Sequence, residues 1–321
     1  MARANNTAEI SQTQANPPAE NRPVAEHAVI RLALPKGRMQ EGVLGLLAGA
    51  GIRVTGGPRA YRPSVSLAGF SAKVLKPQNI VEMLHVRSRD LGFAGADWVA
   101  ELEADAVELL DTGLDPVRLV AAAPRGTFTG GCAGGPIAGD GRSAHRPLVV
   151  ASEYERLTRR WIERRRLNAV FVRSYGATEV FPPEDADCVV DLTATGATLE
   201  ANGLEIIDEL MTSSTRLYAS PAALEDAGRR EAIERFVLLL RSVLEARRRV
   251  MLEVNVTAEK LEAVIAALPC MRQATIAPLH GEAGYAVKAA VPRSELPRVI
   301  PEVKARGGSD LVVSDLSQIV P

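Results

Sequence analysis

The stretch 186–204, ADCVVDLTATGATLEANGL, indicates a buried strand, a turn rich in hydroxyl groups and the start of a helix. Cys188, Val189 and Val190 supply the apolar strand, and Asp191 ends it. A strand that feeds a turn and then a helix directs free backbone N–H groups and the positive end of the helix dipole toward one point. The turn therefore predicts a cradle for a phosphate monoester, formed by Thr193, Ala194, Thr195, Gly196, Ala197 and Thr198.

Asp191 is too close to such an anion to bind it directly. A carboxylate beside a phosphate suits the hydroxyls of a sugar or a metal-bound sugar, so the first hypothesis for this segment is a site for ribose 5-phosphate. The same residues also fit an ordinary strand–turn–helix connection in which threonines cap the helix. The pattern alone leaves both interpretations open.

Working outward, strands and helices alternate on the N-terminal side of this segment. Residues 27–34 are apolar enough for a first strand, and apolar residues at helical spacing follow from 39 to 50. The alternation predicts an α/β fold with a mostly parallel sheet. Lys36 and Arg38 lie in the turn between the first strand and its helix, which makes them a second candidate anion site. Exposed turns often carry cations, so a purely structural role is the alternative.

Two further acidic candidates follow predicted strands. Glu179 comes after the strand 170–173, at the end of the sheet where α/β proteins place ligands. Its alternative role is that of a carboxylate in the first turn of a helix. The strand 90–95 precedes Asp97, which is expected to cap the next helix.

Several other elements are expected from the pattern. Residues 107–110 and 117–123 are predicted as separate short strands, and 221–248 as one long helix. The glycine-rich segment 125–147 lacks a phosphate-loop motif and is expected to be a loop or hairpin tip. The basic helix 156–167 is interpreted as a solvated face and not as a nucleic-acid contact, because the whole chain is not basic.

The last stretch forms a unit of its own. Strands are expected at 250–256, 274–279, 285–291 and 311–313, with helices after the first and third of them. The order βαββαβ is ferredoxin-like. This unit contains no nucleophile–base pair, metal cluster or phosphate loop, so its expected role is regulation or assembly.

Composition limits the possible classes of protein. The 321 residues exceed what one hydrophobic core usually serves, so two or three domains are expected. A net charge of −1 provides no electrostatic footprint for nucleic acid or an anionic membrane, and no apolar run is long enough to span a bilayer. Three widely separated cysteines argue against a disulfide framework. Residues 1–26 lack the apolar core of a secretory signal and are expected to be a disordered tail, so the expected location is the cytoplasm.

Four stretches together resemble ATP phosphoribosyltransferase, the first enzyme of histidine biosynthesis. They are LALPKGRM at 32–39, DLGFAGAD at 90–97, YGATEV with the segment 186–204, and the tail from MLEVNV at 251 through ATIAPL at 274–279. The resemblance runs in the same order over residues 28–321. The βαββαβ tail makes the chain similar to the long form of the family, which carries its own histidine-sensing domain.

The resemblance implies a fold of two α/β lobes of the type II periplasmic-binding-protein kind, followed by the ferredoxin-like regulatory domain. The chain would cross between the lobes near Arg118 and Arg216. The implied divisions are 27–117 with 217–247 for the first lobe, 118–216 for the second lobe, and 248–321 for the regulatory domain. A homo-oligomer, from dimer to hexamer, is also implied.

The resemblance further implies an activity and a site. The enzyme would join N1 of the adenine of ATP to C1 of phosphoribosyl pyrophosphate (PRPP), with Mg²⁺ as cofactor and histidine as feedback inhibitor. The 5-phosphate of PRPP would lie on residues 193–198, while Glu179 and Asp191 would hold the ribose or the metal and Lys36 and Arg38 would offset phosphate charge. The family pattern places Arg59, Lys76, Asp90 and Asp97 near ATP, and Glu253, Asn255 and Thr275 near histidine.

The chain departs from the family pattern in two places. Lys76 and Asn79 stand where the family usually has arginine and aspartate, and residues 182–185 replace a more usual Ala-Pro run. Lysine keeps the charge of arginine but loses its bidentate fork. With these changes, a weakened enzyme stays compatible with the sequence. The alternative function is that of a non-catalytic two-lobed sensor of nucleotides or phosphosugars. The three histidine-site candidates, Glu253, Asn255 and Thr275, have the alternative role of polar residues on a strand surface.

Overall fold

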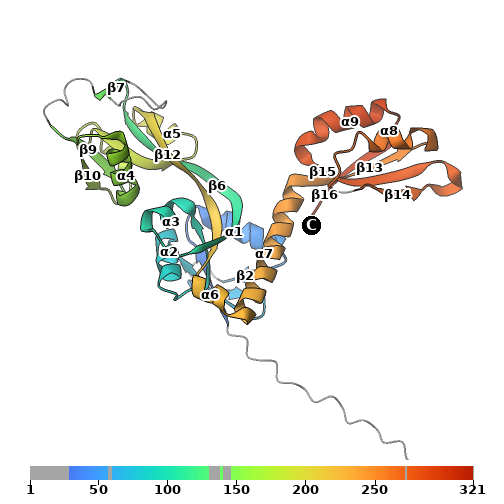
Figure 1. Cartoon of the computed structure of the whole chain (residues 1–321), viewed down its shortest axis with the longest axis horizontal. Coiled ribbons are helices and arrows are strands. Elements are labelled where there is room, and N and C mark those ends of the chain that lie inside the picture. The colour runs from blue at the N-terminus through green and yellow to red at the C-terminus, as the bar shows by residue number, and fades with distance from the viewer. Residues whose placement is uncertain (1–28, 57–59, 130–137, 140–145, 272, 321) are drawn as a thin grey trace, which may run out of the picture.

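The computed structural model describes residues 29–56, 60–129, 138–139, 146–271 and 273–320. A single eight-stranded mixed sheet runs through two lobes in the order β10-β9-β11-β6-β12-β5-β1-β4. Two long antiparallel strands at its centre, β6 (Val107–Pro124) and β12 (Leu204–Ala219), belong to both lobes. Figure 1 shows them passing from one lobe into the other, with α7 leading from the first lobe to a separate C-terminal unit.

Lobe I has helices on both faces of its parallel strands. Leu32 and Leu34 of β1 pack in the cluster that includes α1 and α7, whereas Ala33 between them packs against α2. Burial on both faces explains why three consecutive residues of this strand, 32–34, are all apolar. The elements are β1 (Ile30–Pro35), α1 (Met39–Gly49), β4 (Phe70–Leu75), α2 (Pro77–His85), β5 (Leu91–Gly95) and α3 (Ala96–Leu102), with the small strands β2 (Val54–Thr55) and β3 (Ser64–Val65) beside them.

Lobe II repeats this arrangement around β11. Val190 packs in the cluster that contains Trp161 of α4, and Val189 packs on the opposite face with Leu199 of α5. The predicted apolar strand at 188–190 is therefore confirmed, with side chains buried on both sides of the sheet. The elements are β9 (Leu148–Ser152), α4 (Glu155–Arg165), β10 (Ala169–Arg173), η2 (Thr178–Val180), β11 (Cys188–Thr193) and α5 (Ala197–Ala201), with a hairpin of β7 (Phe128–Thr129) and β8 (Ala138–Gly139).

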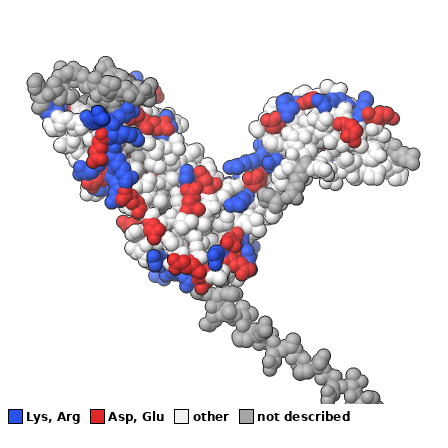
Figure 2. Space-filling view, viewed as in Figure 1, with Lys and Arg blue, Asp and Glu red and all other residues white. Residues whose placement is uncertain are grey.

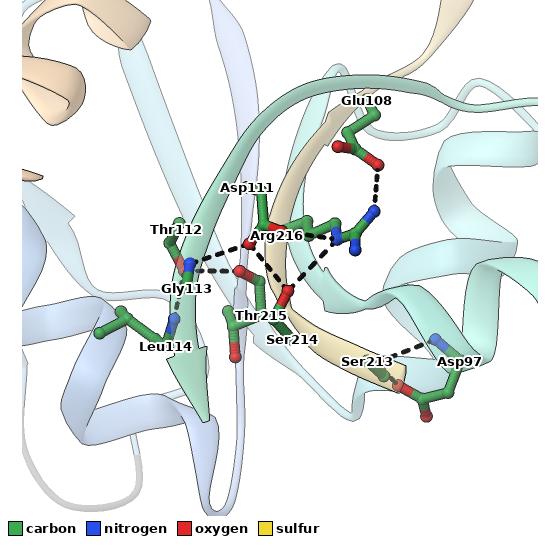
Figure 3. A network of polar contacts seen from close by, with 10 residues as sticks. All are labelled: Asp97, Glu108, Asp111, Thr112, Gly113, Leu114, Ser213, Ser214, Thr215 and Arg216. Atoms are coloured by element: carbon green, nitrogen blue, oxygen red, sulfur yellow. Dashed lines mark hydrogen bonds and ion pairs between the residues drawn. The ribbon is translucent and has the colours of Figure 1, made fainter. Parts of the chain in front are cut away.

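The crossing strands correct one prediction. The two apolar runs at 107–110 and 117–123 are parts of the single strand β6, because the residues between them continue to pair with β12. This pairing is irregular between Ser213 and Arg216, and Gly113 and Asp115 on β6 have positive φ angles of 65° and 49°. Figure 3 shows the polar contacts that replace regular strand pairing here, including Thr112 Oγ1 donating to the carbonyl of Thr215. We call this irregular segment of both strands the hinge.

The predicted helix 221–248 is also two helices, α6 (Pro221–Glu225) and α7 (Ala227–Arg248). Asp226 separates them in an extended conformation, with φ −77° and ψ 120°, and its carboxylate accepts from the Arg229 N–H at 2.7 Å. An aspartate in this conformation is a favourable N-cap, so a new helix begins instead of the first one continuing.

The C-terminal unit confirms the ferredoxin-like prediction. Its sheet order is β14-β15-β13-β16, and its buried residues form a separate hydrophobic core. Valine and leucine alternate with more polar residues along β13, so one sheet face packs against the helices and the other stays open. The elements are β13 (Arg249–Val256), η3 (Ala258–Lys260), α8 (Leu261–Ile265), β14 (Thr275–Pro278), η4 (His280–Glu282), β15 (Tyr285–Pro292), η5 (Arg293–Glu295), α9 (Leu296–Ala305) and β16 (Ser309–Asp315).

Two expectations concern the ends and surface of the chain. The predicted disordered tail at 1–26 lies outside the described residues. No helix in the described part is long and apolar enough to cross a membrane. On the face shown in Figure 2, basic side chains lie beside acidic ones. The same holds for the basic helix α4, where Arg156 pairs with Glu103 and Arg159 pairs with Glu155.

Candidate active site

A cavity of about 340 Å³ lies between the lobes, beside the hinge. Lobe I lines it with Lys36, Arg38 and Asp97, lobe II with Leu192, and the hinge with Ser213 and other residues. These lobe residues come from different segments but follow or end the strands β1, β5 and β11. Because ligands of open α/β sheets bind at the carboxyl ends of the strands, this cavity is the candidate site that the fold itself indicates.

The two cations of lobe I reach the cavity from the tight turn after β1. Gly37 between them has a φ of 89°, a conformation that residues with a side chain rarely adopt. Lys36 Nζ lies 3.4 Å from the Tyr61 hydroxyl and 5.3 Å from the centre of its ring. The structure therefore brings Lys36 and Arg38 to one cavity wall, and Tyr61 contacts Lys36 there without lining the cavity itself.

Asp97 lies at the cavity, but it does not cap a helix as predicted. Helix α3 begins at Ala96, so Asp97 is already inside its first turn. The side chain is 3% exposed, and its Oδ2 accepts from the Tyr154 hydroxyl at 2.8 Å. Its other oxygen accepts from the Ser213 hydroxyl of β12. Asp97 is thus a buried junction between lobe I, lobe II and the hinge.

The structure does not bring Asp90 to the cavity, although it was predicted near ATP. Asp90 precedes β5 at the opposite end from Asp97 and is 1% exposed. Its carboxylate accepts from the Arg31 guanidinium at 2.8 and 2.9 Å and lies 3.5 Å from Arg229. Burial opposes ionisation, but the bonds and charge of Arg31, together with Arg229, hold the pKa of Asp90 below its usual range. These contacts make Asp90 a structural ion-pair residue.

The predicted phosphate cradle is an open turn at the end of β11. Gly196 has a φ of 90°, which lets the chain reverse into α5, and residues 194, 195, 197 and 198 are exposed. Two N–H groups of this turn already have acceptors, because Gly196 donates to Thr193 Oγ1 at 2.8 Å and Ala197 to Thr195 Oγ1 at 3.3 Å. The turn therefore presents hydroxyls and amides together. A bound anion would replace the threonine hydroxyls as the acceptor for these two N–H groups.

Three carboxylates lie near the carboxyl ends of neighbouring lobe II strands: Asp191 is inside β11, near its end, whereas Glu153 and Glu179 follow β9 and β10. The pKa of Asp191 is raised to about 6, mainly because burial disfavours the charged carboxylate; the bond from the Leu192 N–H opposes this rise, and the charges of Glu179 and Glu153 add to it. Within the described residues no three acidic, histidine or cysteine side chains form a ready metal site. Mg²⁺ usually takes one or two carboxylates and completes its shell with water and substrate phosphate oxygens. Asp191 and Glu179 fit that requirement, since a divalent cation would relieve the repulsion that raises the pKa of Asp191.

The remaining predicted nucleotide residues lie at the rim or beyond the described chain. Lys76 is exposed immediately before α2, and the next residue, Pro77, lines the cavity. Asn79 donates to Glu82 of the same helix at 3.1 Å. Arg59 lies outside the described residues.

The three predicted histidine-site residues lie on one surface. Glu253 and Asn255 alternate with buried residues of β13 and occupy the open face of the C-terminal sheet. Glu253 and Thr275 are both register partners of Lys288 on β15, so Glu253, Lys288 and Thr275 form one row across the sheet. Glu253 forms an ion pair with Lys288 at 2.9 Å, and Asn255 donates to Asp310 at 3.2 Å.

Several residues at the site were not predicted from the sequence, although the positions of two of them follow from a signal in it. Glu153 and Tyr154 follow the end of β9 just as residues 174–179 follow the end of β10, and β9 lies between β10 and β11 in the sheet. Applying the strand-end rule to every predicted parallel strand would have included both. Ser213 carries no such local signal, because only the distant pairing of β6 with β12 places it at the cavity.

The fold and the position of the site define a class. The chain is a two-lobed α/β protein of the type II periplasmic-binding-protein kind, with an interlobe site at the strand ends and a ferredoxin-like C-terminal domain. Within that class, residues 76–242 match the family model of ATP phosphoribosyltransferase, and residues 246–318 match the model of the HisG C-terminal domain.

Individual relatives agree with this assignment. The chain is 33% identical over 301 residues to ATP phosphoribosyltransferase of Pelotomaculum thermopropionicum, covering 91% of this chain and 99% of the relative. It is 32% identical over 297 residues to the enzyme of the same name from Chlorobium phaeobacteroides, covering 91% and 98%. A solved ATP phosphoribosyl transferase (HisG:HisZ) complex from Thermotoga maritima contains a chain that aligns with a TM-score of 0.57 and 25% identity, over 68% of this chain and 99% of that one.

The chain therefore belongs to the ATP phosphoribosyltransferase family and has the long-form architecture, with a catalytic part and a C-terminal domain in one polypeptide. It is a pentosyltransferase of the first step of histidine biosynthesis.

Proposed function

We propose that the chain transfers the 5-phosphoribosyl group of PRPP to N1 of the adenine of ATP, giving phosphoribosyl-ATP and pyrophosphate with inversion at C1, and that histidine inhibits it. The observation that carries this proposal is the interlobe cavity. It joins the cations Lys36 and Arg38 of lobe I to Leu192 at the end of β11, the residue immediately before the phosphate cradle 193–198. Two polyanionic substrates could meet there, one on each lobe.

PRPP is assigned to lobe II. Its 5-phosphate would bind the hydroxyls and amides of residues 193–198, while Asp191 and Glu179 face the ribose. Mg²⁺, held by these two carboxylates and by substrate oxygens, would neutralise charge on the leaving pyrophosphate. The carboxylates also favour the positive charge that develops on the ribose as the bond to pyrophosphate breaks.

ATP is assigned to the lobe I wall. Lys36, Arg38 and Lys76 offset phosphate charge, and the buried carboxylate of Asp97 holds the wall in shape through Tyr154 and Ser213. Arg59 is kept as a proposed nucleotide contact. Adenine N1 has a free lone pair, so the protein needs no nucleophile of its own, and alignment of the two substrates supplies most of the catalysis.

Histidine is assigned to the open sheet face of the C-terminal domain, where Glu253, Asn255 and Thr275 lie. We also propose the domain limits given above (27–117 with 217–247, 118–216 and 248–321), a homo-oligomer between dimer and hexamer, and a cytoplasmic location, without nucleic-acid or membrane partners.

The test is a spectroscopic assay in which ATP, PRPP and Mg²⁺ are each omitted in turn and histidine is then added. Product that requires all three and falls with histidine is expected. Asp191→Asn and Glu179→Gln are expected to lower kcat/KM by ~100-fold or more, because each removes a charge beside the reacting ribose. Glu163→Gln, at an exposed position of α4, is the matched control and should retain wild-type rates. Binding of PRPP without any turnover would favour a non-catalytic sensor instead.

A further inference from the structure

Helix α3 of lobe I and helix α4 of lobe II meet directly across the lobe boundary. Residues 97 to 103 present three carboxylates toward the first turn of α4, from Asp97, Glu101 and Glu103. The rings of Trp98 and Tyr154 also contact each other in a tilted arrangement, with centres 4.7 Å apart. We call this contact the α3–α4 bridge. It is a connection between the lobes that does not pass through the hinge.

Glu101 is the buried centre of the bridge. It is 7% exposed, its Oε1 accepts from the Arg156 backbone N–H at 2.9 Å, and its Oε2 accepts from the Leu157 backbone N–H at 2.9 Å. These N–H groups belong to the first turn of α4, whose own N-cap residue, Tyr154, makes no capping bond with its side chain. A residue of lobe I therefore caps a helix of lobe II, and the negative carboxylate also suits the positive end of that helix.

The two remaining carboxylates differ in burial. Asp97 accepts from the buried Tyr154 hydroxyl, whereas Glu103 pairs with Arg156 at 2.7 Å and with Arg160 while roughly half of each side chain is exposed. Exposed ion pairs of this kind contribute little, because solvent screens them. Buried, charge-assisted bonds are stronger and hold a more defined geometry. The restraint on the lobes is thus expected from Glu101 and Asp97, with Glu103 at the margin.

The bridge is continuous with the candidate site in both lobes. In lobe I, Asp97 forms part of the cavity wall. In lobe II, the Tyr154 N–H donates to Ser152 Oγ at 2.9 Å, and that hydroxyl donates to the Val190 carbonyl at 2.6 Å, one residue before Asp191. A shift of α4 relative to α3 would therefore move the carboxylate end of lobe II relative to the cavity wall of lobe I.

The hinge is a place where the strands that cross between the described lobes lose their regular register. It consists of two strands whose pairing is irregular at the crossing, with residues of positive φ on β6. A second, separate attachment point removes the freedom that such a two-stranded connection leaves. We propose that Glu101 is a positioning residue for the transfer: by capping α4 from the other lobe, it holds the ATP and PRPP half-sites at the separation that the reaction requires. This inference rests on the proposed function.

The test variant is Glu101→Gln, which keeps the size of the side chain but replaces one acceptor oxygen by an NH₂ group that cannot accept from a backbone amide. We expect kcat to fall ~10-fold or more at saturating ATP and PRPP, because misaligned reactants lose rate steeply. The dissociation constant of each substrate measured alone should stay within ~3-fold of wild type, because each half-site lies within one lobe. Glu103→Gln is the matched control and should change kcat less than ~2-fold.

A second readout does not depend on turnover. Hydrogen exchange at the Arg156 and Leu157 amides should become faster in Glu101→Gln and stay unchanged in Glu103→Gln, since only Glu101 accepts from them. A lower melting temperature with unchanged kcat, or higher dissociation constants with unchanged kcat, would overturn the positioning role. Absence of turnover in the wild-type protein would refute the proposed function. In that case amide exchange still tests the bridge, and unchanged exchange at Arg156 and Leu157 in Glu101→Gln would refute it.

Discussion

Two aspartates that flank one short strand show how position along a strand decides the role of a side chain. Asp90 and Asp97 bracket β5, and both belong to the segment that resembles the family. Asp90 lies at the N-terminal end, where Arg31 and Arg229 neutralise it. Asp97 lies at the C-terminal end and faces the cavity. The two ends of a strand lie at opposite sides of the sheet, so of these two aspartates only Asp97 lies at the candidate site.

Ionising the Asp191 carboxylate in the folded protein costs free energy, and this cost can be measured as a change in stability with pH. The raised folded pKa of this carboxylate, about 6, means that the native state retains a proton that the unfolded state releases at its ordinary, lower pKa. The stability contributed by this proton is fully present below the unfolded pKa and is lost as pH rises to about 6. We expect the free energy of unfolding of substrate-free wild type to fall by about 1–2 kcal/mol relative to Asp191→Asn over that range.

Urea unfolding of both proteins at pH 4, 5, 6 and 7 measures this difference. Asparagine keeps an oxygen for the Leu192 N–H, which donates to Asp191 at 2.7 Å in the wild type. The same titration of Asp185→Asn, at an exposed position of lobe II, should show no comparable change. A difference between wild type and Asp191→Asn that is constant with pH would contradict the pKa argument.

At the scale of elements, the break between α6 and α7 determines where the long helix begins. Helix α7 supplies Phe236 and Leu240 to the core of lobe I and then continues toward the C-terminal domain. The apolar period of this region is unbroken enough to predict one helix. The capping bond of Asp226 nevertheless starts a second helix, because a local side chain-to-backbone bond satisfies an N–H group that a continuous helix would bond differently.

Removing this cap should destabilise the catalytic part modestly. Asp226→Ala loses the acceptor for the Arg229 N–H and is expected to lower the free energy of unfolding by about 1 kcal/mol, whereas Asp226→Asn should lose much less because asparagine is also a good N-cap. Chemical denaturation followed by circular dichroism measures both. Equal losses in the two variants would show that the charge of Asp226, and not its capping bond, is what matters.

At the scale of the whole molecule, the C-terminal segment returns to lobe I. The Ile319 N–H donates to the carbonyl of Ser242 on α7 at 3.0 Å, and Gln318 Nε2 donates to the carbonyl of Gly49 at the end of α1 at 3.1 Å. Helix α1 follows directly after the turn that carries Lys36 and Arg38. The C-terminal domain is therefore attached to the catalytic part by α7 and also by this segment, which ends against the helix behind the cavity.

This second attachment predicts that catalysis can be separated from the proposed inhibition by histidine. Deleting residues 316–321 should leave kcat within ~2-fold, because no residue of the cavity is removed, but should raise the histidine concentration for half inhibition by ~3-fold or more, because coupling between sites requires a physical connection. Ser317→Ala, a single change in the same segment, is the control. Inhibition that stays unchanged after the deletion would assign the coupling to α7 alone.

The local signals in the sequence determined much of this protein. Strand and helix periods, the strand-to-turn pattern at 188–198 and the βαββαβ order of the tail depend on neighbouring residues, whose spacing the chain itself sets. They were enough for the α/β class, for the ferredoxin-like tail and for the turn at Lys36–Arg38, whereas the two-lobed arrangement came from the resemblance. Asp191 was expected to end its strand, but β11 continues to Thr193. The resemblance added the family, which the comparisons confirm.

Only the tertiary structure decided which distant residues meet. Glu101 caps a helix more than fifty residues away, Asp97 joins Tyr154 and Ser213, and the two apolar runs of β6 become one strand through pairing with β12. No short-range pattern carries these contacts, because burial of charged groups depends on partners that folding brings together. The strand ends could be predicted from the sequence, but the relation between the lobes required the folded chain.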